Sequence, residues 1–321
     1  MDWKALKGRF TPEGRGTSAV FRMPSTVLEI QPDFVLAAKL DGSARRVRRI
    51  GARRVEAGSV TPNPGRSNIV NAEALRDAVR AAMLVVGDGG GQKGLLLSDG
   101  VVRAAILPFE TIPESPKELE ALVRWKMKQH LPYAPEEVRL SYQTAPVESG
   151  GFEVFALALK DSVVSEYDAA AENANGGLDL ILPATAALLP LLPTEPGAQL
   201  LLSVCGGWMT SVVVCGSRVC FWRTREVMQA SPEDTRRLVI TEAARVMASA
   251  RDHMRLEVVH AWFCMRPPGS EEFAQEIGRV ILHQVSVLAP KPDLAVALQQ
   301  QERSLFEDLG APVGGLLMNS L

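Results

Sequence analysis

Apolar and polar positions near the start of the chain predict a group of three strands. Residues 28–30 form a short strand-like run, turn residues follow at 31–33, and a longer apolar run covers 34–40. A second turn signal at 41–43 leads into an arginine-rich third run. Runs of β-forming residues separated by Gly, Pro, Asp and Ser indicate a strand meander.

The same arrangement returns 174 residues later. The runs 202–204, 208–214 and 219–222 follow one another in the same order, and Gly42 falls on Gly216 without a gap. Turn residues are common to many hairpins, so chance similarity is the alternative explanation. If the repeat is real, the chain consists of two α/β halves that each begin with a three-stranded antiparallel meander.

Helix-forming sequence follows each meander. Asn71 can cap a helix over 71–80, and Ser231 with Pro232 signals a helix that continues to about Met254. The second helix has an apolar face of Leu238, Ala243, Val246 and Ala250. Meander, helix, strand and helix, repeated twice, predict a two-lobed α/β architecture rather than a barrel or a bundle.

The segment between the lobes belongs to neither copy. Ser115 and Pro116 begin a helix whose apolar stripe includes Leu119, Val123 and Met127, and two strand-like runs follow at 138–144 and 152–159. We therefore predict a small inserted α+β subdomain. The predicted division is an extension at 1–24, a first lobe at 25–100 and 178–196, the inserted subdomain at 101–177, and a second lobe at 197–321.

Composition places the chain among ordinary globular proteins. Of 321 residues, 46% are hydrophobic and 22% are charged, which excludes disordered, fibrous and disulfide-stapled classes. None of the four cysteines forms a C-x-x-C pair, so we expect neither a metal cage nor a disulfide framework, and a reducing compartment fits best. The first twenty-four residues lack the apolar region of a secretory signal, and three prolines interrupt the apolar stretch 178–193. We expect a cytoplasmic protein.

The net charge of −2 conceals an uneven distribution. Residues 1–66 carry 13 basic and 6 acidic side chains, and the excess is concentrated in one arginine cluster. The cluster comprises Arg45, Arg46, Arg48, Arg49, Arg53 and Arg54. A solvated edge strand is the favoured interpretation, and an anionic membrane surface is the second. No aromatic residues are interleaved, so we do not expect nucleic-acid binding.

The block 119–142 resembles the type IV pilus assembly protein PilM family. It reads as a helix that ends in Leu131-Pro132-Tyr133, an acidic pair at Glu136 and Glu137, and a strand. The resemblance implies an actin-like fold, a duplicated ribonuclease H-like architecture related to FtsA, with the insertion as its distinguishing small subdomain. It also implies a cytoplasmic location peripheral to the inner membrane.

Proteins of this fold hold ATP with three loops, and each loop departs from the family pattern here. The first should offer Asp-x-Gly, but the chain has Glu29, Gln31 and then Pro32, which has no N–H for a phosphate. The second offers Ser203 and Cys205 in place of Asp and Gly, although Gly206 and Gly207 follow. In the third, we place Ala261 and Trp262 where glycines support adenine. We therefore expect a non-catalytic protein without a cofactor, in which ATP and Mg²⁺ binding is disfavoured.

The resemblance also implies a partner. In the PilM family, a groove captures the short cytoplasmic tail of the membrane protein PilN, and coupling to pilus motor ATPases is expected. Extended peptides dock through backbone hydrogen bonds and apolar pockets. We assign one wall of such a groove to Trp125, Lys126, Lys128, Leu131 and Tyr133. The alternative for this turn is a purely structural role, with Trp125 and Tyr133 in the subdomain core.

Other sites and functions are less favoured. The loop 89–94 satisfies G-x-G-x-x-G, but a strand rather than a helix follows it, so a flexible hairpin loop is preferred. The four histidines lack partners at ligand spacing, and Cys215 and Cys220 are predicted to be small core residues, so no metal site is expected. Two functional alternatives remain, an active actin-like ATP-binding protein and the cytoplasmic part of a type II secretion protein. The latter class continues into a membrane span, which we do not expect before Leu321.

Overall fold

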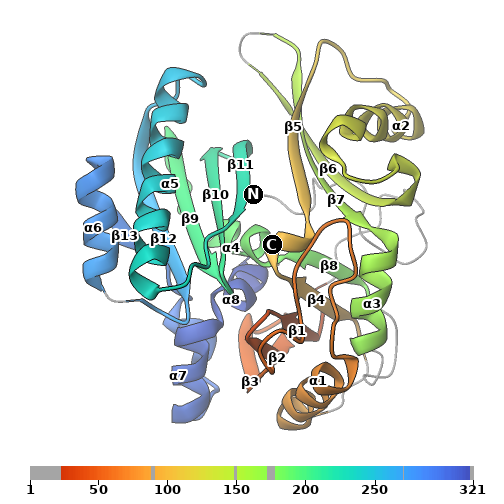
Figure 1. Ribbon diagram of the computed structural model, residues 1–321, viewed down its shortest axis with the longest axis vertical. Helices are drawn as coiled ribbons and strands as arrows, with labels where there is room; N and C mark the ends of the chain where they lie inside the picture. The colour runs from red at the N-terminus through yellow and green to blue at the C-terminus, as the bar shows by residue number, and fades with distance from the viewer. Residues whose placement is uncertain (1–22, 88–90, 148–149, 172–177, 270, 319–321) are drawn as a thin grey trace.

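The described part of the protein contains two five-stranded sheets and one three-stranded sheet (Figure 1). The computed structural model describes residues 23–87, 91–147, 150–171, 178–269 and 271–318. The predicted extension at 1–24 therefore lies almost entirely outside the described residues. No described helix is long and apolar enough to cross a membrane.

The first sheet has the strand order β3-β2-β1-β4-β8. Its strands are β1 (Thr26–Ile30), β2 (Phe34–Asp41), β3 (Arg46–Arg54), β4 (Lys93–Leu97) and β8 (Leu180–Pro183). The meander β1-β2-β3 is antiparallel, whereas β4 and β8 run parallel to β1. Because β4 is parallel to β1, the glycine-containing segment before it is a crossover connection, and our expectation of a hairpin loop there was wrong. Residues 88–90 of that segment lie outside the described part.

The second sheet repeats this order as β11-β10-β9-β12-β13. Its strands are β9 (Ala198–Cys205), β10 (Trp208–Cys215), β11 (Arg218–Glu226), β12 (Val258–Arg266) and β13 (Val285–Val287). Again the first three strands are antiparallel and the last two are parallel to the first. Phe34 and Trp208, which the repeat aligned, each begin the second strand of their meander. The two equivalent sheets confirm the predicted α/β fold with a duplicated meander.

Helices cover the outer faces of both sheets. In the first lobe, α1 (Ala72–Val86) packs on β2 and β3, and Leu75, Val79 and Ala82 are its buried face. In the second lobe, α5 (Pro232–Asp252) and α6 (Glu271–Ile281) share a core cluster with β9 and β12. The predicted caps are present, since Asn71 and Ser231 each accept a hydrogen bond from a backbone N–H in the first turn of the helix.

The third sheet has the order β5-β7-β6 and forms the upper right part of Figure 1. It consists of β5 (Arg103–Phe109), β6 (Val138–Pro146) and β7 (Phe152–Lys160), all antiparallel. The helix α2 (Pro116–Met127) begins at Ser115 as predicted and places Leu119, Val123 and Met127 against this sheet. The opposite face of the sheet contributes to a core cluster that contains residues of both lobes.

Helices of two segments make contacts outside the predicted ranges in which they fall. The helix α3 (Asp161–Ala171) falls in the range 101–177 and packs both against β7 of the inserted sheet and against α1 in the first lobe. The helices α7 (Gln300–Leu309) and α8 (Ala311–Met318) fall in the range of the second lobe. They pack on β3 and on α4 (Ala184–Leu188), which continues β8. The end of the described chain therefore returns to the first lobe.

The remaining described elements are short. They are the 3₁₀ turns η2 (Asp99–Val101), η3 (Lys128–His130), η4 (Pro135–Glu137), η5 (Leu189–Leu191) and η6 (Pro292–Ala295).

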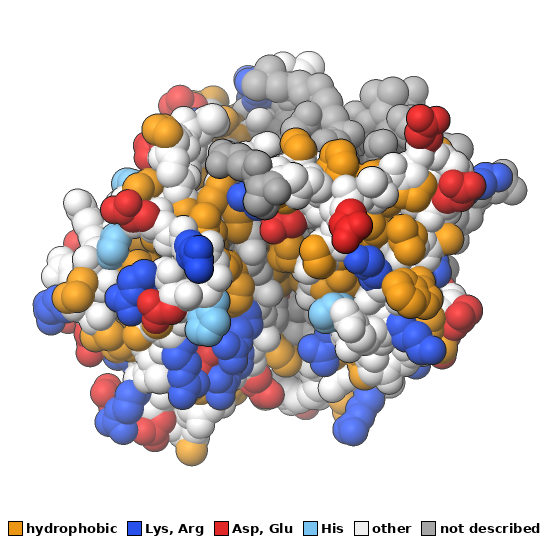
Figure 2. All heavy atoms as spheres, turned by 90° about the horizontal axis from the view of Figure 1, so that it is seen from above, with side chains coloured by type: hydrophobic (Ala, Val, Ile, Leu, Met, Phe, Trp, Pro, Cys, Tyr) orange, Lys and Arg blue, Asp and Glu red, His pale blue; other side chains and the backbone are white. Residues whose placement is uncertain are grey.

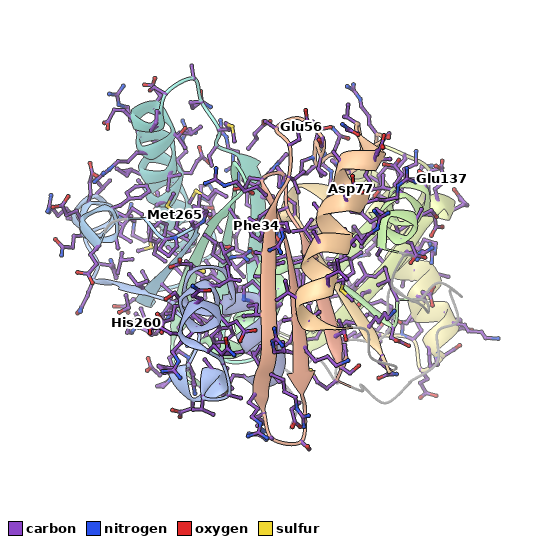
Figure 3. All side chains as sticks on the ribbon, turned by 90° about the horizontal axis from the view of Figure 1, so that it is seen from below. Phe34, Glu56, Asp77, Glu137, His260 and Met265 are labelled. Atoms are coloured by element: carbon purple, nitrogen blue, oxygen red, sulfur yellow. The ribbon has the colours of Figure 1, made fainter. Side chains whose placement is uncertain are left out.

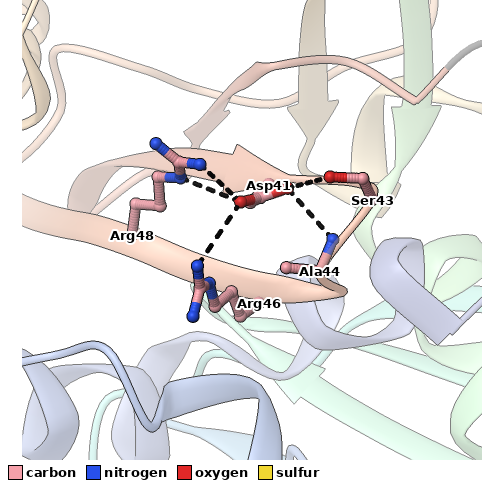
Figure 4. Close-up of polar contacts among 5 residues, drawn as sticks. All are labelled: Asp41, Ser43, Ala44, Arg46 and Arg48. Carbon is pink, nitrogen blue, oxygen red and sulfur yellow. Dashed lines mark hydrogen bonds and ion pairs between the residues drawn. The ribbon is translucent and has the colours of Figure 1, made fainter.

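The arginine cluster lies on the edge strand β3 and on the turn before it, as predicted. Asp41, at the end of β2, accepts hydrogen bonds from Ser43 and Ala44, and its Oδ2 lies 2.5 Å from Arg48 Nη2 and 3.8 Å from Arg46 Nη2 (Figure 4). The Arg48 guanidinium and these turn donors hold the pKa of Asp41 well below its usual range. The carboxylate therefore stays ionised near neutral pH and compensates part of the cluster's charge.

Candidate functional site

The first two nucleotide-loop positions face each other across the boundary between the lobes. Gln31 and Pro32 lie in the turn after β1, and Gly206 and Gly207 lie in the equivalent turn after β9. Both glycines have positive φ, 55° and 79°, so the turn needs residues without a Cβ. A Cβ on Gly206 would lie 2.6 Å from Cδ of Pro32. The two turns are therefore in direct contact, and no space for a phosphate chain remains between these residues.

A buried ion pair lies behind the two turns. Arg266 Nη1, at the end of β12, is 2.7 Å from Oε1 of Glu29 on β1. The Gln31 side chain donates to the same oxygen at 2.7 Å, and Arg266 Nη1 also donates to the carbonyl of Leu309 at 3.2 Å. Both charged side chains are almost completely excluded from solvent, at 2% and 0% exposure. The pair connects the first strands of one lobe to the second lobe.

Electrostatics favours the charged form of Arg266. Burial alone would lower the pKa of this guanidinium, but Cys205 and Glu29 raise it above its ordinary value. Burial raises the pKa of Glu29, and Arg266 opposes that effect. Carboxylate and guanidinium thus compensate each other in a low-dielectric environment, where an isolated charge would be strongly unfavourable.

A second polar cluster joins the lobes near this ion pair. Asp99, directly after β4 in η2, accepts hydrogen bonds from the backbone N–H and the hydroxyl of Thr185. It also accepts one from Thr210 on β10 at 2.8 Å, and Thr210 is 3.0 Å from the Thr224 hydroxyl. Burial raises the pKa of Asp99, while these donors lower it in part. The neighbouring Gly100 lies against the Trp208 ring, where a Cβ would approach to 2.5 Å.

Some polar atoms of the ion-pair region have no hydrogen-bond partner among the described residues. These atoms are Glu29 Oε2, Gln31 Oε1, Arg266 Nε and Arg266 Nη2. A buried network with unpaired atoms stabilises less than a fully paired one. Nevertheless, the carboxylate that would organise Mg²⁺ already binds an arginine of this chain. The donor set at this boundary therefore does not fit a Mg²⁺-nucleotide.

The residues predicted for the third nucleotide loop do not form a loop. Ala261 and Trp262 lie in the middle of β12, and Trp262 pairs with Leu201 of β9 in the parallel ladder. Trp262 Nε1 donates to Gln199 Oε1 at 2.9 Å, and its ring stacks on His260 at 4.4 Å. The pattern failed because glycine positions were assigned to a strand interior. The segment that follows β12 begins at Pro267 and contains Gly269.

A small cavity lies at the turn after β12. It has a volume of about 110 Å³ and is lined by residues of β12, the segment after β13 and α7, including Arg266, Leu288 and Asp308. Pockets for small ligands usually measure about 300–1,000 Å³, so this one is too small for a nucleoside. A larger hollow of about 690 Å³ lies elsewhere, between the ends of α5 and α6, and has no contact with the ion pair. Figure 3 shows Phe34 at the boundary between the lobes, and Met265 in the second lobe beyond it.

The predicted partner-binding residues fall into two groups. Trp125 and Lys128 are exposed, and they lie on one side of the helical segment because they are three residues apart. Trp125 is 68% exposed, so the alternative that placed it in the subdomain core was wrong. Lys126 points to the sheet, where its Nζ donates to the carbonyl of Pro108 and lies 4.3 Å from the Phe109 ring centre. Figure 2 shows hydrophobic side chains exposed on the right-hand half of this end of the molecule, where α2 lies.

Leu131 and Tyr133 form the second group. Both are partly buried against the cluster under α2. Tyr133 lies close to Gly65 of the first lobe, where a Cβ would be 3.6 Å from its ring, and Lys160 Nζ is 5.5 Å from the ring centre. Burial raises the pKa of Tyr133 to about 12. This group therefore lies where the inserted sheet meets the first lobe.

Sequence reasoning missed the residues that join the lobes. Arg266, Asp99 and Thr185 come from three separate segments, and none belongs to a recognised motif. One signal was present, since Arg266 is a single cation at the end of the apolar run that begins at Val258. Its partner could not be inferred, because Glu29 lies 237 residues away.

Within the described residues, no group of three or more His, Cys, Asp and Glu side chains could hold a metal ion.

Comparison with known proteins identifies the fold. The chain matches no protein-family model and no curated protein sequence. Its structure is similar to that of a PilM-PilN type IV pilus biogenesis complex, with a TM-score of 0.72 and 16% identity over 92% of this chain and 98% of that one. It is also similar to a Bacteroides thetaiotaomicron protein with an actin-like ATPase fold and unknown function, with a TM-score of 0.53 and 8% identity over 92% and 95% of the two chains. This chain therefore has the two-lobed actin-like fold.

Proposed function

We propose that this chain is a non-catalytic adaptor of a type IV pilus assembly complex. In this proposal it lies on the cytoplasmic side of the inner membrane and binds the N-terminal tail of a PilN-like membrane protein. The likeness to the PilM-PilN complex over almost the whole length of both chains supports the choice of partner. The resemblance of the block 119–142 to the same family supports it independently.

The contact between the lobes carries the non-catalytic part of the proposal. Pro32 and Gly206 touch where a phosphate chain would lie, and Glu29 pairs with Arg266. An ATPase of this fold needs a free carboxylate near Mg²⁺ and backbone N–H groups directed at phosphate. Here the residues at those positions bind each other instead. We therefore expect the lobes to be held together without nucleotide.

A calorimetric titration of the full chain with Mg-ATP tests this part. We expect no heat of binding at concentrations up to about 1 mM, where an affinity of about −4 kcal/mol would still be detected. Low-micromolar binding would contradict the proposal and would favour the alternative of an active actin-like ATP-binding protein.

The tail-binding surface is proposed to include Trp125 of α2 and Lys128 of η3, which are both exposed. An exposed tryptophan supplies a large apolar area, and tryptophan is common among residues that dominate binding energy. Lys128 adds a positive charge beside it. Tyr133 and Leu131 would extend this surface toward the first lobe.

A binding assay with the N-terminal cytoplasmic peptide of a PilN-like membrane protein tests the partner. We expect Trp125→Ala to weaken binding of a fluorescently labelled peptide at least tenfold. Truncating a central aromatic side chain typically costs about 2 kcal/mol or more of binding free energy. Leu84→Ala is the matched control, since Leu84 is also highly exposed, at 77%, but lies on α1. Failure of the unmodified chain to retain the peptide would refute the adaptor proposal, and equal weakening by both variants would refute the surface.

A further inference from the structure

Three arginines meet one buried carboxylate on the outer side of the second sheet. Glu242 lies in the middle of α5, and its side chain is only 3% exposed. Arg225 Nη1 lies 2.6 Å from its Oε1, and Arg245 Nη1 lies 2.5 Å from the same oxygen. Arg223 Nη2 lies 3.7 Å from its Oε2. One carboxylate therefore pairs with three guanidinium groups.

The alternation of side chains along β11 explains why the arginines gather here. The Thr224 hydroxyl is hydrogen-bonded to Thr210 in the polar cluster between the lobes. Because successive side chains of a strand point to opposite faces, Arg223 and Arg225 are directed to the other face, where α5 lies. Arg245 comes from α5 itself. Figure 1 shows α5 on the side of this sheet that is turned away from the first lobe, so the cluster is separate from the nucleotide-loop positions.

Positive charges exceed negative ones at this site. Three guanidinium groups and one carboxylate leave a net charge of +2, and no other acidic side chain of the described residues lies within 4 Å of the three arginines. The side chains of Arg223, Arg225 and Arg245 remain 49%, 40% and 56% exposed. Like charges held around one carboxylate repel one another, and Glu242 offsets this repulsion only in part. An anion with two negative charges would complete the compensation.

The guanidinium groups also keep donors for a ligand. Arg225 and Arg245 bind Glu242 through Nη1, and neither Nε nor Nη2 of these two side chains donates to a described residue. Arginine presents such N–H groups as a planar fork that matches the oxygens of a phosphate. The shared contact with Glu242 keeps the three groups side by side, so their remaining donors are presented together.

We propose that Arg223, Arg225 and Arg245 bind a phosphate monoester in its doubly charged form. The excess of two positive charges favours a dianion over a phosphodiester or a carboxylate, which each carry a single negative charge. The three side chains are open to solvent, so the group esterified to the phosphate can project outward. That group belongs either to a lipid or to a soluble molecule. The proposal does not depend on the proposed adaptor function.

Calorimetric titration of the full chain with phenyl phosphate at pH 7.5 tests the proposal, because a phosphate monoester is mostly doubly charged at this pH. We expect a dissociation constant of about 1 mM or lower, as two or three charge-assisted hydrogen bonds provide. Methyl phenyl phosphate, a diester with one negative charge, should bind at least tenfold more weakly. No heat of binding with phenyl phosphate at about 10 mM, or equal affinity for the two compounds, would overturn the proposal.

Substitutions at Arg225 locate the site. Arg225→Gln should weaken the binding of phenyl phosphate by about tenfold or more, because it removes charge-assisted hydrogen bonds. Arg225→Lys keeps the charge beside Glu242 but not the fork, and it should also weaken binding. Arg237→Gln is the matched control, since Arg237 is 72% exposed on the same helix α5 but pairs with Asp234. Equal affinities of the Arg225→Gln and Arg237→Gln variants would refute the site.

Flotation with vesicles that contain phosphatidic acid distinguishes the two sources of the phosphate, because this lipid has a monoester headgroup. If the source is a lipid, Arg225→Gln should reduce flotation and phenyl phosphate should compete with the vesicles. If the source is soluble, the variant and the unmodified chain should float equally, while only the unmodified chain binds phenyl phosphate tightly. Equal dependence of flotation on Arg225 with phosphatidylserine, whose phosphate is a diester, would contradict recognition of a monoester.

Discussion

Arg266 Nη1 lies 2.7 Å from Oε1 of Glu29, and this contact joins two residues that are 237 positions apart in the chain. Glu29 is part of β1 and Arg266 ends β12, the strand that runs parallel to β9 in the other sheet. In the equivalent strand orders β12 takes the place of β4, so the pair connects the central strand of the first sheet to the strand beside the central one in the second sheet. In a fold that can enclose a nucleotide between its lobes, this chain places an internal ion pair at the boundary.

Removing one charge of this pair should destabilise the whole chain. Arg266→Met leaves the Glu29 carboxylate buried without a cation, and breaking a buried ion pair in this way costs about 3–5 kcal/mol. Urea unfolding followed by tryptophan fluorescence measures the loss in the free energy of unfolding.

The double variant Glu29→Leu with Arg266→Met is the control. Replacing both charges with apolar side chains of similar size is often neutral or stabilising, so much of the loss should be recovered. A double-mutant cycle with no coupling between the two positions would mean that the contact does not form in solution.

Docking of the last helix on the first lobe depends on Gly315. A Cβ at this position would lie 1.8 Å from the backbone carbonyl oxygen of Ala187. The close approach of α8 to α4 therefore requires a residue without a side chain at position 315. Because a backbone atom cannot move aside as a side chain can, Gly315→Ala should cost about 3 kcal/mol or more, at the upper end of overpacking effects. Thermal unfolding by circular dichroism measures the effect.

The adjacent Gly314 offers a matched comparison in the same helix. Its added Cβ would meet side-chain atoms at 3.2 Å and beyond. Alanine also favours a helix over glycine by about 1 kcal/mol. Gly314→Ala should therefore change the stability by less than about 1 kcal/mol, and equal losses for the two variants would contradict the close approach of α8 to α4.

Alkylation of Cys215 should depend on pH with a midpoint near neutrality. Its pKa is lowered to about 7, so the thiolate forms as the pH rises through that value and the rate with iodoacetamide should rise with it. The largest cause is the hydrogen bond from Cys220. Cys220→Ala removes the donor, and the midpoint should move toward the ordinary cysteine value of about 8.5. An unchanged midpoint in that variant would assign the shift to Arg218.

The arginine cluster should contribute to any binding of anionic membranes. A basic residue near an anionic surface adds up to about 1 kcal/mol. Glutamine at Arg45, Arg46, Arg48 and Arg49 should therefore lower the binding to phosphatidylserine vesicles about tenfold or more in a flotation assay. The expected loss in binding free energy is smaller than four full arginine contributions, because Asp41 pairs with Arg46 and Arg48, and Glu302 lies 2.7 Å from Arg49.

Asp41→Asn gives the opposite test of the same surface. It frees two arginines without adding a cation, so vesicle binding should increase at low salt and show no change on neutral lipid. Because the pKa of Asp41 lies below its usual range, the pairing persists at neutral pH and is lost only as the pH falls through the lowered value. Identical vesicle binding by the unmodified chain and by both variants would remove the membrane-facing role of this edge.

The sequence by itself determined the local elements and their order. Alternating apolar runs with turn residues predicted both meanders, and the caps at Asn71, Ser115 and Ser231 predicted where three helices begin. These signals are readable because each depends on neighbours within a few residues. The repeat of the meander also predicted the duplicated α/β fold, because two segments with the same order of strands and helices are expected to form sheets with the same strand order.

Only the tertiary structure decided which distant groups meet. It placed Trp125 on the surface and brought Glu29 to Arg266. It also returned α7 and α8 to the first lobe. Such contacts depend on how whole sheets and helices pack, and their energies come from burial and pairing of groups far apart in the chain. A local sequence pattern does not depend on those distant partners, and therefore these contacts could be seen only in the tertiary structure.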